Sequence, residues 1–72
     1  MTLREILKGK NNILTKEYER FGDRLIFIGA TYYAGGQLIS LDGGFYTLDL
    51  EPCAYEWDDD GNLMIVRWAN DD

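Results

Sequence analysis

The stretch RLIFIGATYYAGGQLISLDGGFYTLDL, residues 24–50, decides the fold, because two Gly-Gly pairs divide it into runs rich in β-branched and aromatic residues. Gly-Gly is a typical two-residue turn between antiparallel strands. With such turns, Tyr32 faces Ile39 and Leu41 faces Tyr46, and both registers place one apolar set on the same side of the sheet. The predicted core face consists of Ile26, Ile28, Ala30, Tyr32, Ile39, Leu41, Tyr46, Leu48 and Leu50.

A third hairpin is predicted in YEWDDDGNLMIVRW, residues 55–68, with Asp-Gly as the turn dipeptide. A two-residue turn makes Trp57 face Met64 and leaves the three aspartates at a solvated tip. The apolar face of this hairpin consists of Tyr55, Trp57, Met64, Val66 and Trp68.

The N-terminus predicts a short helix. Thr2-Leu-Arg-Glu5 is a capping box, an apolar stripe follows it, and Gly9 stands where a glycine commonly ends a helix. Residues 12–21 fit either a helix or a strand, and a strand is favoured because a hairpin partner follows at once.

The sequence therefore predicts one α+β domain over residues 1–72. It consists of a short N-terminal helix and a four- to five-stranded antiparallel β-meander, which the helix covers or which curls into a half-barrel.

The opposite face of the predicted sheet carries a second apolar patch. It consists of Phe27, Tyr33, Leu38, Phe45 and Leu63. Either the helix or residues 12–21 cover this patch, or it is a binding surface or a dimer interface.

Charge is divided unevenly along a chain whose net charge is −6. Residues 42–72 contain nine acidic residues and one basic residue, whereas residues 1–41 contain six basic and four acidic residues. Such a field repels nucleic acid and anionic membranes, so it indicates either a basic partner protein or a charge that serves solubility alone.

Several kinds of chemistry are excluded by composition. The chain has no histidine, one cysteine and no glycine-rich phosphate-binding motif, so we predict no enzyme activity and no cofactor. The acidic loop matches the start of a calcium-binding loop, but Arg67 stands where the essential twelfth-position acid belongs, so no metal site is predicted. Cys53 is expected to be a small buried residue in a reducing cytosol, and with no membrane span or secretory signal we expect a cytoplasmic location in a bacterial host cell.

The acidic residues suggest a mimic of DNA phosphates. On a strand, side chains two residues apart repeat at roughly 6.6–6.8 Å, which is about two phosphate rises of 3.4 Å, and Glu56 and Asp58 have this spacing. An exposed aromatic would supply the anchor. The predicted partner-binding residues are Asp42, Asp49, Glu51, Glu56, Asp58, Asp59, Asp60, Tyr33 and Phe45.

Residues 38–68, LISLDGGFYTLDLEPCAYEWDDDGNLMIVRW, resemble short proteins carried by phages and mobile elements of Gram-positive bacteria. Those proteins share a LISLDG-x-Y-x-L hairpin followed by a YEW-acid-acid hairpin. The resemblance implies a counter-defence inhibitor of the anti-CRISPR type, which occupies the basic nucleic-acid-binding surface of a larger host protein such as a CRISPR effector nuclease. The alternative is a small interaction module or assembly subunit that forms a homodimer through its sheet.

Overall fold

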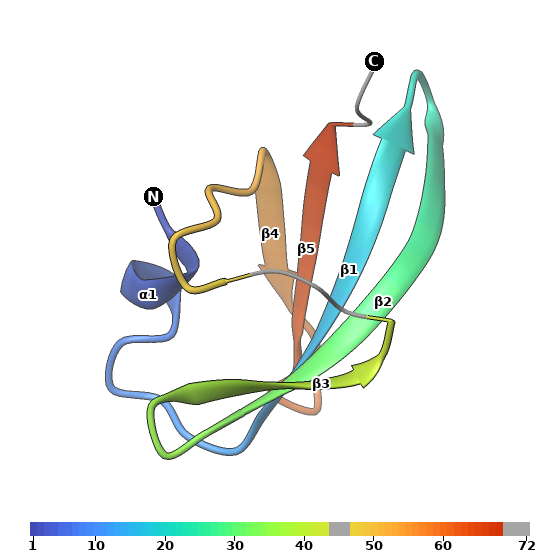
Figure 1. Cartoon of the computed structure of the whole chain (residues 1–72). Coiled ribbons are helices and arrows are strands. Elements are labelled where there is room, and N and C mark those ends of the chain that lie inside the picture. The colour runs from blue at the N-terminus through green and yellow to red at the C-terminus, as the bar shows by residue number, and fades with distance from the viewer. Residues whose placement is uncertain (44–46, 69–72) are drawn as a thin grey trace.

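The computed structural model describes residues 1–43 and 47–68. Its elements are α1 (Leu3–Ile6), β1 (Ile13–Phe21), β2 (Arg24–Ala34), β3 (Gln37–Asp42), β4 (Ala54–Trp57) and β5 (Leu63–Trp68). The strands form one sheet in the order β3-β2-β1-β5-β4, and α1 lies on one side of it (Figure 1). The predicted combination of a short helix with a β-sheet is confirmed, as is a strand within residues 12–21.

The sheet is mixed, so the predicted antiparallel meander is wrong. β1 is the central strand, and it pairs antiparallel with β2 but parallel with β5. β3 and β4 are edge strands, so the sheet does not close into a barrel and the half-barrel is not confirmed. Turn dipeptides indicate only the strands that a turn joins, whereas β1 and β5 lie far apart in the sequence.

The helix begins as predicted, at the capping box. The Glu5 N–H donates to the Thr2 hydroxyl at 3.4 Å, and the Thr2 N–H donates to the Glu5 carboxylate at 2.9 Å. Gly9 has a φ of +76°, which glycine adopts without strain, and the chain turns away there. A helix of four residues is not stable alone, so α1 depends on its contacts with the rest of the domain.

Residues 47–50 contact α1 instead of forming the predicted next strand. The carbonyls of Leu48 and Leu50 accept hydrogen bonds of 2.9 Å from the first two N–H groups of α1. Those N–H groups have no partner within a helix, so this turn satisfies them. Tyr46, which was expected to pair with Leu41, lies outside the described residues.

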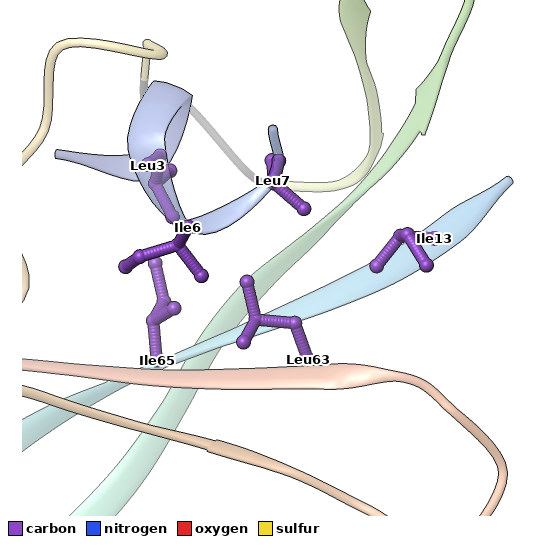
Figure 2. Close-up of a cluster of buried hydrophobic side chains, with 6 residues drawn as sticks. All are labelled: Leu3, Ile6, Leu7, Ile13, Leu63 and Ile65. Carbon is purple, nitrogen blue, oxygen red and sulfur yellow. The ribbon is translucent and has the colours of Figure 1, made fainter. Parts of the chain in front are cut away.

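The hydrophobic core lies between α1 and the sheet. Its buried members are Leu3, Ile6, Leu7, Ile13, Leu63 and Ile65. Figure 2 shows the side chains of α1 and of Leu7, which directly follows it, on the side of β5 from which its two buried side chains project, with the β1 side chain beside them. Partly buried side chains surround this cluster: Tyr33, Leu38, Leu48, Leu50 and Trp57.

The helix covers the face of the sheet opposite to the predicted core face. The predicted pairing of Tyr32 with Ile39 is confirmed. However, the side chains that pack against the core are those of Tyr33, Leu38 and Leu63, which belong to the predicted second patch. Of the described strand residues expected in the core face, Ala30 alone is buried, and the others are half-buried or exposed: Ile26, Ile28, Tyr32, Ile39 and Leu41.

At two places the chain has one residue more than the predicted registers allow, and each extra residue moves neighbouring side chains to the other face of the sheet. The first is a bulge in β2, where the register with β1 shifts after Glu17 and leaves Ile28 as an extra residue. As a result Phe27, rather than Ile26, lies on the same side of the sheet as Tyr32.

The second insertion lies in the β4–β5 loop, which has three residues rather than two. The Asp58 N–H closes the loop by donating to the Asn62 carbonyl at 2.9 Å, and the glycine before Asn62 has a φ of +81°. A turn followed by a left-handed glycine is typical of three-residue hairpin loops. The predicted register is therefore wrong by one residue, and Trp57 pairs with Leu63 instead of Met64.

Candidate protein-binding surface

The face of the sheet that points away from α1 has no described element over it, and we call it the open face. The strand registers place on it the buried Ala30 and also Leu14, Lys16, Tyr18, Arg20, Leu25, Phe27, Tyr32, Ile39, Leu41, Ala54, Glu56, Met64, Val66 and Trp68. The β1–β2 hairpin also extends away from α1 (Figure 1), and near its turn Phe21 is exposed on the other side of the sheet.

The open face exposes a large apolar area. Five of its large side chains have exposed fractions between 45% for Phe27 and 64% for Trp68. They are Leu25, Phe27, Ile39, Leu41 and Trp68. Taking about 200 Å² for each whole side chain, they expose on the order of 500 Å². The largest patches on ordinary monomers reach about 300–600 Å², and a stable complex buries roughly 800 Å² per partner, so this face is large enough to be the centre of an interface.

A pocket of about 130 Å³ lies on the open face. Its lining residues come from four strands: Tyr18, Leu25, Ala54, Tyr55, Glu56, Met64 and Val66. Ala54 pairs with Val66, which pairs with Tyr18. Because the alanine side chain is a single methyl group between larger neighbours, it leaves the hollow.

One of the cations on the open face is engaged by the chain itself. The Arg20 guanidinium lies 5.6 Å from the centre of the Trp68 ring, and its Nε donates to the Gly22 carbonyl at 2.9 Å. The open face is therefore an apolar surface with a few charges, rather than a row of carboxylates.

Two of the predicted partner-binding carboxylates instead contact the N-terminal segment. Asp49 pairs with Arg4 at 3.0 Å, and Glu51 lies 3.7 Å from the N-terminal ammonium group. Both side chains are largely exposed, so each ion pair contributes little to stability.

The acidic loop separates three aspartates that the sequence groups together. Asp58 is half-buried, and its carboxylate accepts hydrogen bonds of 2.9 Å from the N–H groups of Asp60 and Asn62. Asp59 and Asp60 are exposed at the tip. β4 ends at Trp57, so Asp58 lies directly after the strand that holds Glu56.

The remaining predicted site residues lie apart from one another. Asp42 is exposed at the end of β3, and Glu56 is exposed on the open face beside the pocket. Tyr33 is half-buried against the core. Phe45 lies outside the described residues. Cys53 was expected to be buried but is exposed, and its thiol donates to the Val66 carbonyl at 3.2 Å.

A buried ion cluster lies on the helix-covered face. The Arg67 guanidinium is 3.4 Å from Glu17 and 3.1 Å from Glu19, and the Glu17 side chain is 3% exposed. Burial raises the pKa of Glu17 above its ordinary value of 4.5, the Arg67 charge opposes this rise, and the Glu19 charge adds to it. Glu17 lies on the face opposite to the pocket, so we interpret the cluster as structural.

Glu17 and Glu5 should contribute opposite slopes to the pH dependence of stability, on the two sides of pH 4.5. The native state holds the Glu17 proton more tightly than the unfolded chain does, so this group's contribution falls as pH rises from 4.5 through its raised pKa. Hydrogen bonds from the Thr2 N–H and hydroxyl lower the pKa of Glu5, whose contribution is therefore lost as pH falls below 4.5.

Urea unfolding between pH 3.5 and 8 checks both slopes. Glu17→Gln should remove the part of the decrease in unfolding free energy above pH 4.5 that Glu17 causes. Glu5→Gln should remove the part of the decrease below pH 4.5 that Glu5 causes. Difference curves that show the same pH dependence for both variants would contradict this assignment.

Within residues 1–43 and 47–68, no three cysteine or carboxylate side chains form a group that could hold a metal ion. No helix among them is long and apolar enough to cross a membrane.

Sequence reasoning missed the open face as a site, because most of its large apolar residues were expected in the core. The signal that could have found it is the short helix, whose stripe of Leu3, Ile6 and Leu7 can cover only one of two apolar faces. Comparison of the chain with protein-family models, curated proteins and solved structures gives no match. The functional proposal therefore depends on geometry and charge.

Proposed function

We propose that this protein is a non-catalytic binding protein that docks through the open face of its sheet onto a basic surface of a larger protein. The observation that carries the proposal is the open face, on which large apolar side chains from three strands are about half exposed. A monomer gains nothing from exposing such a group, whereas burying it against a partner is favourable at about 25 cal/mol per Å² before the costs of association.

The charge of the chain supports a basic partner. The net charge is −6. Of the predicted partner-binding carboxylates, four are exposed and form no ion pair within the described part of the chain, so they remain available to a partner: Asp42, Glu56, Asp59 and Asp60. Exposed charges of this kind mainly raise the association rate and select the partner, while the apolar face supplies most of the affinity.

A basic surface that binds nucleic acid is the partner surface that fits this description best. Occupying it would make the protein a stoichiometric inhibitor. The counter-defence inhibitor implied by the sequence resemblance is a special case, in which the partner is a CRISPR effector nuclease.

A second candidate is a homodimer, favoured by the two open edges of the sheet. β3 and β4 each have a neighbour on one side only, so each has backbone groups that can pair with another chain. Light scattering of the pure protein between micromolar and millimolar concentration tests it, because a dimer doubles the scattering mass.

The experiment that tests the main proposal is capture on the immobilised protein from a bacterial lysate, with Ile39→Lys as a parallel bait. We expect a basic nucleic-acid-binding protein that the wild type retains, that the variant loses, and that competing DNA or RNA displaces. A captured set that is the same on both baits would contradict the proposal.

A further inference from the structure

The pocket on the open face combines apolar walls with one carboxylate. Tyr18, Leu25, Met64 and Val66 supply apolar surface, and Glu56 is exposed at its edge. Its volume of about 130 Å³ is close to that of an engineered cavity of roughly 150 Å³ that holds benzene, so it admits one side chain rather than a larger ligand.

The charge at the pocket selects among possible occupants. An anion would meet both the Glu56 carboxylate and the net charge of −6. A neutral apolar group would fill the walls but leave the carboxylate without a partner as the interface removes water from it. A long cationic side chain satisfies both parts, because its stem is apolar and its end is charged.

Within the cationic side chains, arginine fits better than lysine. Its planar guanidinium binds a carboxylate through two parallel hydrogen bonds and also stacks on aromatic rings. The pocket offers one carboxylate, Glu56, and one aromatic ring on the same face, Tyr18. The chain already shows such contacts elsewhere, since Arg20 lies over Trp68 and Lys10 lies 5.2 Å from the centre of the Trp57 ring.

Lys16 is the cation of this chain that lies nearest in register. It pairs with Met64, which pairs with Glu56, so Lys16 and Glu56 are two strand spacings apart, about 10 Å. No ion pair joins them in the described structure. Lys16 therefore leaves the carboxylate open to another cation, although it reduces the local negative charge.

We infer that this pocket receives an arginine side chain of the partner protein, with the stem against Val66 and Met64 and the guanidinium on Glu56. The inference rests on the proposed function, and it names the partner group that anchors the interface.

The test uses three small probes of similar shape and different charge: n-butylguanidinium, n-butylurea and pentanoate. Each is titrated into the isotope-labelled protein, and the methyl NMR signals of Leu25, Met64 and Val66 are followed. We expect the cation to bind about three- to fivefold more tightly than the neutral urea, as for an exposed ion pair, and pentanoate to bind most weakly.

Three variants separate charge from shape. Glu56→Gln should reduce the affinity for the cation to that for the urea, and Ala54→Leu should fill the pocket and remove binding of both. Asp59→Asn removes the same charge at the loop tip and should leave the preference unchanged. Ala54 and Glu56 are exposed, so these changes leave the core intact.

Two results would overturn the inference. Equal binding of guanidinium and urea, or a cation preference that survives Glu56→Gln, would show that the pocket takes an apolar group. Shifts that spread over the surface, or none at all, would show that it takes no side chain. In either case the proposed function is judged separately, by whether Ile39→Lys loses the captured protein.

Discussion

Replacing Ile65 with alanine is expected to lower the free energy of unfolding by about 3 kcal/mol, whereas the same replacement at Ile39 should cost less than about 1 kcal/mol. Ile65 is fully buried between β5 and α1, so its truncation leaves a cavity. Ile39 is 50% exposed on the open face, where water fills the vacated space. A domain of this length has a total stability of roughly 4–11 kcal/mol, so the loss at Ile65 is a large share.

Urea denaturation of the two variants beside the wild type measures this difference. The chemical change is identical, so the comparison isolates the face of the sheet. If the loss of unfolding free energy at Ile39 equalled or exceeded that at Ile65, Ile39 would have to lie in the core. The helix would then cover the face of the sheet that the sequence predicted as the core face, and the open face would not exist.

Ile39→Lys is expected to weaken binding to the captured partner by at least about a hundredfold, because it places a charge within the proposed apolar contact. Ser40→Lys is the matched control. Ser40 is the next residue of β3, is also exposed and points to the opposite side of the sheet, so it adds the same charge on the same strand. We expect this control to weaken binding less than about fivefold.

Titration calorimetry with the purified partner gives both affinities, and thermal unfolding shows that both variants fold. Equal losses for the two lysines would mean that added positive charge, rather than the open face, reduces binding.

In contrast, Asp59→Asn with Asp60→Asn should lower the association rate and its salt dependence with a smaller change in affinity.

The features predicted correctly from the sequence are encoded by neighbouring residues. The capping box of Thr2 and Glu5 and the pairing of Tyr32 with Ile39 depend on a few adjacent residues each. The strand over residues 13–21 was preferred because its hairpin partner follows directly.

The face of the sheet that packs against the helix could not be predicted, because both faces are partly apolar. The covered face includes three buried polar residues, Thr15, Glu17 and Thr31. In the sequence this face therefore looks more polar than the open face, although the helix packs on it. A single inserted residue at Ile28, and another in the β4–β5 loop, exchange the faces of the segments that follow.

The exposure of two loop carboxylates was predicted from the sequence, but the apolar residues of the open face were not. The exposed tip carboxylates of Asp59 and Asp60 were expected on the surface and are found there. Met64, Val66 and Trp68 were assigned to the core and instead line the open face. The position of a binding surface depends on which face remains uncovered, and that depends on contacts between segments far apart in the sequence.

The central claim is that the open face is the binding surface, and methyl NMR of the labelled protein during titration with the purified partner tests it most directly. We predict that the methyl signals of Leu14, Ile39, Leu41 and Val66 shift or broaden, while those of Leu3, Ile6 and Ile65 stay in place. Changes confined to the acidic loop, with the open-face methyls unperturbed, would contradict the account.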